Sequence, residues 1–536
     1  MRILCCPHLP GSPELSPFFN VLASRVLHRH AALGWSGLVA RVASTAHQAE
    51  SSWNEPDQED FLSRLRTALA AGTFLPNSPL LVHAGDARPK LFACFAIDAC
   101  RPLDEFLALA RNIHNGMGGV GFSLERFGDA ASAETFLAAV DEDTVANQAG
   151  RPRPASSAVT VPISHPAAEA VFARSGRMRT INMNLGISDS FMVRLSGGDP
   201  TAATAFKRLA DAVHLTGQPG VVFTDRIPRI ACERDAVFAA NVCGEAPLAA
   251  DESGLLGSLN LVAFARRNSV GAFALDEAGL QETTATAVRF LDGMHDLHYH
   301  ASSRLGANSL ATRKIGVGVM GFAHLLVLLG VAYDSPEAEV VAGNIGRLMT
   351  KAAQSESERL AALRGSFPAW RPVLGISSRR NACLVAIAGT ATLALLVGTT
   401  GGIEPIFAHV GRHRVMECEF AILDPLVAYM AQAKGLDPVE VAGRLVGGER
   451  LDTVLGPILG RLLPTAIELS GEAHVRIQAA FQREIDGGIS KTINCPARTT
   501  PEQIGAWVRL AHECGCMGLT IYRDNSLPSQ PVSRLA

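Results

Sequence analysis

Three residue types that can act together in catalysis stand two positions apart in the segment Asn241-Val242-Cys243-Gly244-Glu245. In extended backbone, side chains at i, i+2 and i+4 point to the same side, so amide, thiol and carboxylate would face one space. A thiol between a hydrogen-bonding amide and a general base is a compact reaction centre. The pattern alone also fits a loop with a buried cysteine, because free cysteines are usually buried.

The secondary structure predicted around this segment is that of an α/β protein. Residues 1–74 read as helical, and the stretch 58–71 carries an apolar stripe that ends at Gly72. The stripe consists of Phe61, Leu62, Leu65 and Leu69. After Leu75, short apolar strands alternate with glycine-rich turns and amphipathic helices, which indicates largely parallel strands.

A strand–helix–strand unit is predicted near the end of the chain. Residues 490–495 read as a strand, and Thr500, Pro501 and Gln503 form a capping box with proline at the first helical position. Residues 518–522 read as the next strand, so this βαβ unit is expected to belong to a sheet or barrel.

Composition excludes several classes of protein. The chain has 536 residues, 48% of them hydrophobic and 18% charged, which is typical of a globular enzyme. Its net charge of -3 implies no general attraction to nucleic acid or to an anionic membrane. Eleven cysteines without disulfide-framework spacing indicate the reducing cytoplasm, and no secretory signal is predicted. The apolar stretches 315–333 and 382–399 are interpreted as buried core, not membrane spans.

Two further motifs could suggest a cofactor or metal site, and neither is interpreted as one. Residues 316–321 satisfy G-x-G-x-x-G, but no apolar strand precedes them, so a dinucleotide site is not favoured. His295, His298 and His300 form a cluster without accompanying metal-ligand spacing, and we expect a solvated or core-edge cluster and no metal site.

Four segments carry a resemblance to a known family. They are FLPNSPLLVHAGDARPKLFACFAIDA (74–99), GMGGVGFSLERFG (116–128), the stretch 218–261 with NVCGEAPL, and RRNACLVAIAGTATLALLVGTTGGIEPIFA (379–408). Together with the C-terminal unit they resemble adenosylcobalamin-dependent (class II) ribonucleotide reductases over about residues 75–524. The resemblance implies a ten-stranded α/β barrel with a central finger loop, preceded by a helical N-terminal region. The expected division is 1–74 (helical), 75–526 (barrel) and 527–536 (flexible tail).

The resemblance also implies residue roles. Cys243 would carry a thiyl radical that removes the ribose 3′ hydrogen, Glu245 would take the 3′-hydroxyl proton, and Asn241 would hydrogen-bond the sugar. Cys94 matches one of the two cysteines that are oxidised during reduction. The residues expected to bind substrate are Ser78, Ala93, Gly119, Thr390, Ala391 and Thr392.

The expected radical source is adenosylcobalamin. The chain has only four tyrosines, none adjacent to another, so the tyrosine relay of the di-metal class is not predicted. Nothing resembles a glycyl radical loop either. The expected partners are a ribonucleotide substrate and an external reductant, either a thioredoxin-like protein or a small molecule, and a homodimer is a candidate assembly.

The chain departs from the family pattern in its redox cysteines. Gly254 takes the place of the second cysteine, and no cysteine pair occurs near the end of the sequence. We expect either an external reductant or a spatial substitute among Cys100, Cys232 and Cys383.

Other departures are smaller. Val242 and Gly389 stand where the family usually has proline, and residues 129–157 are shortened relative to the loop that links effector to substrate. Three functions therefore remain open. They are reduction of ribonucleotides, a non-reductive or biosynthetic radical reaction on a nucleotide, and a silent nucleotide-binding paralogue.

Overall fold

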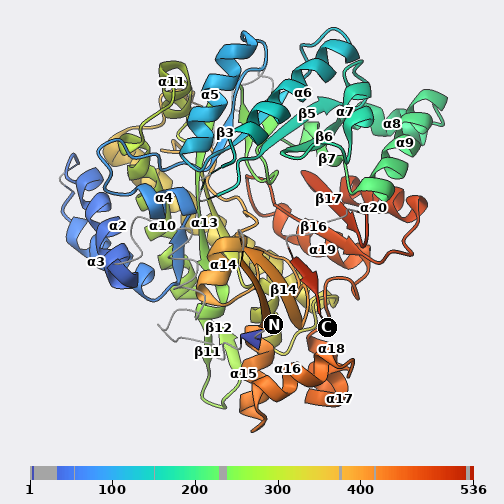
Figure 1. Cartoon of the computed structure of the whole chain (residues 1–536). Coiled ribbons are helices and arrows are strands. Elements are labelled where there is room, and N and C mark those ends of the chain that lie inside the picture. Colours follow the sequence, from blue (N-terminus) through green and yellow to red (C-terminus); the bar gives the residue numbers. More distant parts are fainter. Residues whose placement is uncertain are drawn as a thin grey trace.

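The computed structural model (Figure 1) shows an α/β protein built around one large sheet. It describes residues 3–4, 33–53, 55–149, 151, 153–227, 238–372, 377–415, 418–526 and 532–535.

Ten strands form this sheet, in the order β13, β10, β3, β4, β5, β6, β7, β17 and β16, with β2 paired to β10. Strands β3 to β7 run parallel to one another. Strands β10 and β17 are antiparallel to the two ends of this parallel set. The strands span Phe74–Pro76 (β2), Cys94–Ala96 (β3), Gly119–Ser123 (β4), Ser157–Pro162 (β5), Ile181–Ile187 (β6), Gly220–Phe223 (β7), Glu252–Asn260 (β10), Ile315–Met320 (β13), Thr492–Cys495 (β16) and Gly518–Arg523 (β17).

The segment 383–387 closes the sheet between its edge strands. The backbone N–H groups of Ile315 and Val317 in β13 donate to the carbonyls of Cys383 and Leu384, at 3.0 and 2.8 Å. On its other side, Ile387 forms a parallel bridge with Ile489, shortly before β16. The ten strands and this segment therefore form the expected α/β barrel.

Helices cover the outside of the sheet, and α5 to α9 lie beside β3–β7 (Figure 1). Apolar side chains from both layers form one continuous core. The helices are α4 (Ser78–His83), α5 (Leu103–Asn115), α6 (Ala130–Ala146), α7 (Ala168–Arg174), α8 (Asp189–Ser196), α9 (Pro200–Thr216), α10 (Glu277–Leu297), α11 (Ser303–Thr312), α12 (Phe322–Leu328), α13 (Pro336–Arg364), α14 (Ala391–Val397), α15 (Pro425–Ala433), α16 (Pro438–Val446), α17 (Leu451–Leu455), α18 (Pro457–Leu462), α19 (Gly471–Gln482) and α20 (Pro501–Glu513).

The N-terminal region packs two helices, α2 (Gly34–Glu50) and α3 (Gln58–Ala70), against α10. The predicted apolar stripe of α3 is buried. Buried ion pairs join this region to the barrel helices, because Arg364 contacts Glu50 at 2.9 Å and Glu55 at 2.5 Å. Arg289 on α10 also contacts Glu50, at 2.7 Å.

The G-x-G-x-x-G segment is strand β13 inside the barrel. A Cβ on Gly318 would lie 2.5 Å from the carbonyl oxygen of Ala386, and one on Gly316 would collide with the Leu256 side chain. These two glycines therefore let β10 and the closing segment approach β13, and this packing agrees with the interpretation of residues 315–333 as buried core.

The C-terminal unit has the predicted form. Strands β16 and β17 are parallel, and α20 lies between them in the chain with the complete capping box of Thr500 and Gln503. Within the expected tail, the described strand β18 (Val532–Arg534) pairs with β14 (Val410–Val415), so this part is paired to a sheet. That second sheet also contains β1 (Ile3–Leu4) and β15 (Cys418–Leu423), while β11 (Ala265–Arg267) and β12 (Phe273–Leu275) form a separate hairpin.

Among the described residues, no helix combines the length and apolar character needed to cross a membrane.

Candidate active site

A short hairpin of β8 (Phe238–Ala240) and β9 (Pro247–Ala249) carries the N-x-C-x-E segment at its tip. Asn241 closes this tip, because its carbonyl accepts from Gly244 N at 3.0 Å and its side-chain oxygen accepts from Ala246 N at 3.0 Å. Gly244 has a φ of +81°, a backbone conformation that disfavours other residues. The asparagine and the glycine thus shape the turn that carries Cys243.

The hairpin lies against β4, whose glycines leave room for it. A Cβ on Gly119 would lie 2.6 Å from Cγ2 of Val242, and one on Gly121 would collide with the carbonyl oxygen of Ala240. The expected substrate residue Gly119 is therefore in contact with the finger loop itself. Its N–H also donates to the carbonyl of Ala93 at 2.8 Å.

Two residues that were not predicted from the sequence hold the tip through hydrogen bonds to its backbone. Asn182 on β6 donates from Nδ2 to the Val242 carbonyl at 3.0 Å. The N–H of Gly488 donates to the Glu245 carbonyl at 2.8 Å, and a Cβ there would lie 2.8 Å from the carbonyl oxygen of Gly244. The sequence offered a signal for each residue. Asn182 is a polar residue within a mostly buried strand, and Gly488 belongs to a pair of glycines that precedes a strand.

Cys94 on β3 meets the loop at this tip. Nδ2 of Asn241 donates to Sγ of Cys94 at 3.0 Å, and Sγ of Cys94 is 3.8 Å from Oε1 of Glu245. All three side chains are buried. Oε2 of Glu245 has no hydrogen-bond partner within the described residues. A buried acceptor without a donor has a free-energy cost that a hydroxyl-bearing ligand would relieve.

Cys243 is accessible to solvent, yet the surrounding protein still desolvates its thiol. Burial, followed by the nearby Glu245 carboxylate, raises the pKa of Cys243 to about 12. Burial likewise raises the pKa of Cys94 well above its ordinary value, and the charge of Glu245 adds to this effect. Both cysteines are therefore protonated thiols near neutral pH, the form from which a hydrogen atom can be removed or donated.

Burial also raises the pKa of the Glu245 carboxyl above its ordinary 4.5. Its own backbone, the Asn241 side chain and the charge of Arg153 oppose this rise. A carboxylate with a raised pKa is a stronger base, which suits proton transfer from a hydroxyl group.

Gly254 lies directly opposite Cys94 in the antiparallel pairing of β10 with β3. The described cysteines that were predicted to replace the second redox cysteine, Cys383 and Cys100, lie far from Cys94. Cys94 and Cys383 are separated by three strand spacings, through Gly254 and Lys314, or about 14 Å. A disulfide requires Cα atoms within about 7 Å, so the prediction that Cys383 replaces the second cysteine is wrong.

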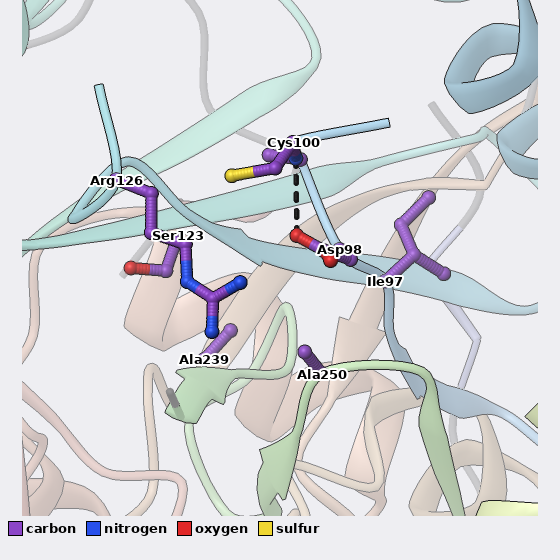
Figure 2. Close-up of a pocket in the computed structure, with 8 residues that line it drawn as sticks. Ile97, Asp98, Cys100, Ser123, Arg126, Ala239 and Ala250 are labelled. Atoms are coloured by element: carbon purple, nitrogen blue, oxygen red, sulfur yellow. Dashed lines mark hydrogen bonds between the residues drawn. The ribbon is translucent and has the colours of Figure 1, made fainter. Parts of the chain in front are cut away.

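Cys100 is also remote from Cys94. The chain stays extended through Ile97, which is already about 10 Å from Cys94, because Ile97 N donates to the Gly121 carbonyl. Cys100 then lines a cavity with Ser123 and Arg126 beyond the end of β3 (Figure 2). Its substitution for the second cysteine is excluded as well, and Cys232 lies outside the described residues.

Two other expected substrate residues lie next to strands of the barrel, Ser78 after β2 and Ala93 before β3. Ser78 begins α4 just after Asn77, whose N–H donates to the Leu256 carbonyl in β10 at 3.0 Å. Ala93 is half-buried beside Cys94.

The Gly/Thr loop follows the closing segment that borders Gly488. Thr390 is in the left-handed region and accepts a hydrogen bond at Oγ1 from Gly402 N, at 2.8 Å. Ala391 and Thr392 form the first turn of α14, and both reach solvent. The fold thus brings this loop toward the barrel end that holds Glu245, while its contact with phosphate remains a prediction.

The histidine cluster is not solvated, because His295 and His298 are buried and only His300 is partly exposed. His298 stacks on Phe92 and accepts from Leu91 N at 2.9 Å, and His295 contacts the Lys314 carbonyl at 3.1 Å. No group of three or more histidine, cysteine or acidic side chains able to hold a metal occurs in the part of the chain that is described.

Comparison with known proteins identifies the family. The model of the ribonucleotide reductase barrel domain matches residues 200–373 and 376–522. The vitamin B12-dependent ribonucleoside-diphosphate reductase of Mycobacterium tuberculosis (strain CDC 1551 / Oshkosh) is 33% identical over 93% of this chain and 77% of its own length. The enzyme of that name from Thermoplasma acidophilum is 31% identical over 88% of this chain and 66% of its own.

A solved structure supports the same fold. The alpha subunit of the Actinobacillus ureae class Id ribonucleotide reductase superposes with a TM-score of 0.74, covering 90% of this chain and 93% of that one, at 19% identity. With the barrel model and the sequence relatives, this similarity shows that the chain belongs to the ribonucleotide reductase family, as a large chain of its vitamin B12-dependent (class II) branch.

Proposed function

We propose that this chain reduces ribonucleotides to 2′-deoxyribonucleotides, with adenosylcobalamin as cofactor and Cys243 as the radical-bearing thiol. The observation that carries the proposal is the meeting of Cys94, Asn241 and Glu245 around an accessible Cys243 at the tip of the finger loop. The relatives named as vitamin B12-dependent reductases cover most of the chain.

The surroundings of Cys243 are compatible with the cofactor. Cys243 is exposed, and a Cβ on the next residue, Gly244, would meet no atom within 4 Å, so this part of the loop tip is open. Tyr333 donates its hydroxyl to the Ile403 carbonyl at 2.7 Å, within the core and not at the finger loop. When bound, adenosylcobalamin supplies the radical, and the barrel supplies position and exclusion of water.

The other steps of the reaction are assigned to residues of the chain. The Cys243 thiyl radical removes the ribose 3′ hydrogen, and the unpartnered Oε2 of Glu245 accepts the 3′-hydroxyl proton. This proton transfer labilises the neighbouring C–O bond, and the 2′-hydroxyl leaves as water after it takes the proton of the Cys94 thiol. Asn241 orients the sugar.

Substrate binding is assigned to three segments of the chain outside the finger loop. Ser78, Ala93 and Gly119 would border the sugar. The loop of Thr390, Ala391 and Thr392 would hold the phosphates through backbone amides and hydroxyls. We also propose a cytoplasmic protein and a homodimeric assembly.

The reductant is proposed to be external. Reduction requires two electrons, and Cys94 supplies only one, since its strand neighbour is Gly254. A thioredoxin-like protein or a small-molecule reductant would supply the second electron and would also return the oxidised Cys94 to its thiol, so that both electrons of a turnover come from the external reductant. The same observation favours a second candidate, in which the thiyl radical performs a non-reductive or biosynthetic reaction on a nucleotide.

One assay separates the candidates. The purified protein is incubated with adenosylcobalamin and each ribonucleotide, with dithiothreitol, thioredoxin or formate, and deoxynucleotide is measured. Deoxynucleotide with any reductant establishes reduction. Tritium exchange from the cofactor's 5′ carbon without deoxynucleotide indicates the second candidate, and the absence of both indicates a silent paralogue.

A matched pair of variants checks the radical thiol. We expect Cys243→Ser to lower turnover and exchange by more than about 1,000-fold, and Cys100→Ser, in the separate cavity of Figure 2, to change turnover less than about twofold. Activity that survives Cys243→Ser would refute the assignment of the radical.

A further inference from the structure

Ser490 has a hydroxyl group that the scheme above does not use. The residue lies in the extended segment between α19 and β16, where its backbone N–H donates to the Ile387 carbonyl at 2.8 Å. Its side chain is half-buried, and within the described part of the chain its Oγ makes no hydrogen bond to another residue. A hydroxyl can donate one hydrogen bond and accept two, so this group is available to a ligand.

The Ser490 side chain faces the interior of the barrel. Its segment pairs in parallel with the closing segment, through the bridge of Ile387 with Ile489. Side chains alternate along an extended strand, so Ser490 lies on the same face as Gly488, which packs on the finger loop. Ala388, opposite Ser490 in this pairing, packs with buried apolar residues of the finger hairpin. Both neighbours therefore place the hydroxyl on the side of the reaction centre.

The next residue, Lys491, agrees with this alternation. Its side chain is fully buried, and Nζ donates to Nδ1 of His474 at 2.7 Å and forms an ion pair with Glu404 at 2.5 Å. The ammonium group is thus engaged on the other face of the segment. Between Gly488 and Lys491, Ser490 carries the polar side chain that is turned toward the finger loop.

Ser490 lies between the two parts of the proposed substrate site. Gly488, whose N–H donates to the Glu245 carbonyl at 2.8 Å, is two strand residues away, or roughly 7 Å. In the other direction, Oγ of Ser490 lies 3.2 Å from the position that a Cβ on Gly389 would take, at the start of the Gly/Thr loop. A 5′-phosphate is joined to the ribose through C5′ and O5′, so it lies within a few ångströms of the sugar. The hydroxyl thus stands where the phosphate nearest the ribose would lie.

We propose that Ser490 is a further substrate-binding residue, whose hydroxyl donates a hydrogen bond to the phosphate group next to the ribose. The inference rests on the proposed function, in which the ribose meets Glu245 and the Gly/Thr loop holds the phosphates. It adds a contact that ribonucleoside monophosphates and diphosphates share. Hydrogen bonds to a charged acceptor are stronger than those between neutral groups, so the loss of this one is measurable.

The first test measures binding without the cofactor. Isothermal titration calorimetry gives the Kd of each ribonucleoside 5′-diphosphate and of the matching monophosphate, for the wild-type protein and Ser490→Ala. We expect Ser490→Ala to raise both Kd values about tenfold, because both ligands carry the phosphate next to the ribose. The matched control is Ser355→Ala, at an exposed serine on α13, which should change each Kd less than about twofold.

A second measurement separates a phosphate contact from a general loosening of the site. In the ³¹P spectrum of bound ribonucleoside diphosphate, we expect Ser490→Ala to shift the resonance of the phosphorus next to the ribose and to leave the outer one in place. In turnover assays KM should rise about tenfold with kcat within about twofold, since the bond is made in the ground state and the transition state alike.

The outcomes distinguish the two proposals. Unchanged Kd values in Ser490→Ala, or equal shifts of both phosphorus resonances, would overturn the role of Ser490, whatever the reaction. Weaker binding and the selective shift in Ser490→Ala, with neither deoxynucleotide nor tritium exchange in the wild type, would support Ser490 and overturn the proposed function. A wild-type protein that binds no ribonucleotide would overturn both.

Discussion

Gly254 on β10 and Cys94 on β3 are directly opposite each other in antiparallel register. A Cβ added to Gly254 would have its nearest neighbours at 3.6 Å (Leu248) and 3.7 Å (the Lys314 carbonyl oxygen), which are ordinary contact distances. A side chain at this position therefore has room beside the Cys94 thiol. The glycine leaves Cys94 without a second thiol at the site where the strands would place one.

Gly254→Cys should accordingly create a redox pair with Cys94. Opposite residues in antiparallel strands have Cα atoms about 4.5–5.5 Å apart, within the range of a disulfide. On oxidation we expect the loss of two hydrogens and one cross-linked peptide pair by mass spectrometry, together with increased thioredoxin-dependent turnover. The double variant Cys94→Ala/Gly254→Cys should show neither, and an uncross-linked Gly254→Cys protein would contradict the register.

Glu245→Gln should lower activity and raise stability at alkaline pH. Removal of a general base lowers turnover by about 100- to 10,000-fold. Burial raises the folded-state pKa of Glu245 above 4.5, so its stabilising protonated form is lost as the pH rises through that folded-state pKa. The uncharged glutamine therefore gains stability relative to the wild type at pH 8, by about 1 kcal/mol, and gains little at pH 4. Thermal unfolding at both pH values checks the sign, and an advantage confined to pH 4 would contradict it.

Asn182→Ala should impair turnover through the backbone before Cys243. The variant loses the 3.0 Å hydrogen bond to the Val242 carbonyl, worth about 1 kcal/mol, and the thiol loses part of its orientation. We expect kcat to fall about tenfold with little change in melting temperature. Asn184→Ala on the same strand is the control, since Asn184 donates to the Val159 carbonyl and not to the loop. Equal losses in both variants would show a general effect on β6.

Arg364→Met should destabilise the junction of the N-terminal helices and the barrel. The substitution leaves Glu50 and Glu55 buried with fewer cations, at a cost of about 3–5 kcal/mol in the free energy of unfolding. Urea unfolding measures the loss, and proteolysis within residues 33–74 should accelerate.

The exposed pair Arg208–Glu169, at 2.7 Å, provides the control for that measurement. Arg208→Met should change the free energy of unfolding by less than about 1 kcal/mol, because exposed ion pairs contribute little. Similar losses in both variants would mean that the buried network does not anchor the N-terminal helices.

Much of the local structure was predictable from the sequence. The stripe of α3, the capping box of α20 and the strand–helix–strand unit follow from side-chain periodicity and backbone preferences, which act over a few residues. The spacing of Asn241, Cys243 and Glu245 likewise placed an amide, a thiol and a carboxylate on one loop. The resemblance extended these observations to the barrel and to Cys94.

The environment of the site was not predictable in the same way. Asn182 and Gly488 reach the finger loop from distant parts of the chain, and Cys383 and Cys100 were wrongly considered near Cys94. Sequence distance says nothing about which strands become neighbours, because strand order results from packing of the whole sheet.

The sequence by itself thus determined the reactive groups, their spacing on the loop and the substitution of glycine at position 254, since these are covalent facts of the chain. Only the tertiary structure decided that Gly254 faces Cys94, that Cys94 meets Asn241 and Glu245, and that Asn182 holds the loop beside Cys243. The reason is physical: protonation and reach depend on desolvation and on distances of a few ångströms, which arise when the barrel closes around the loop.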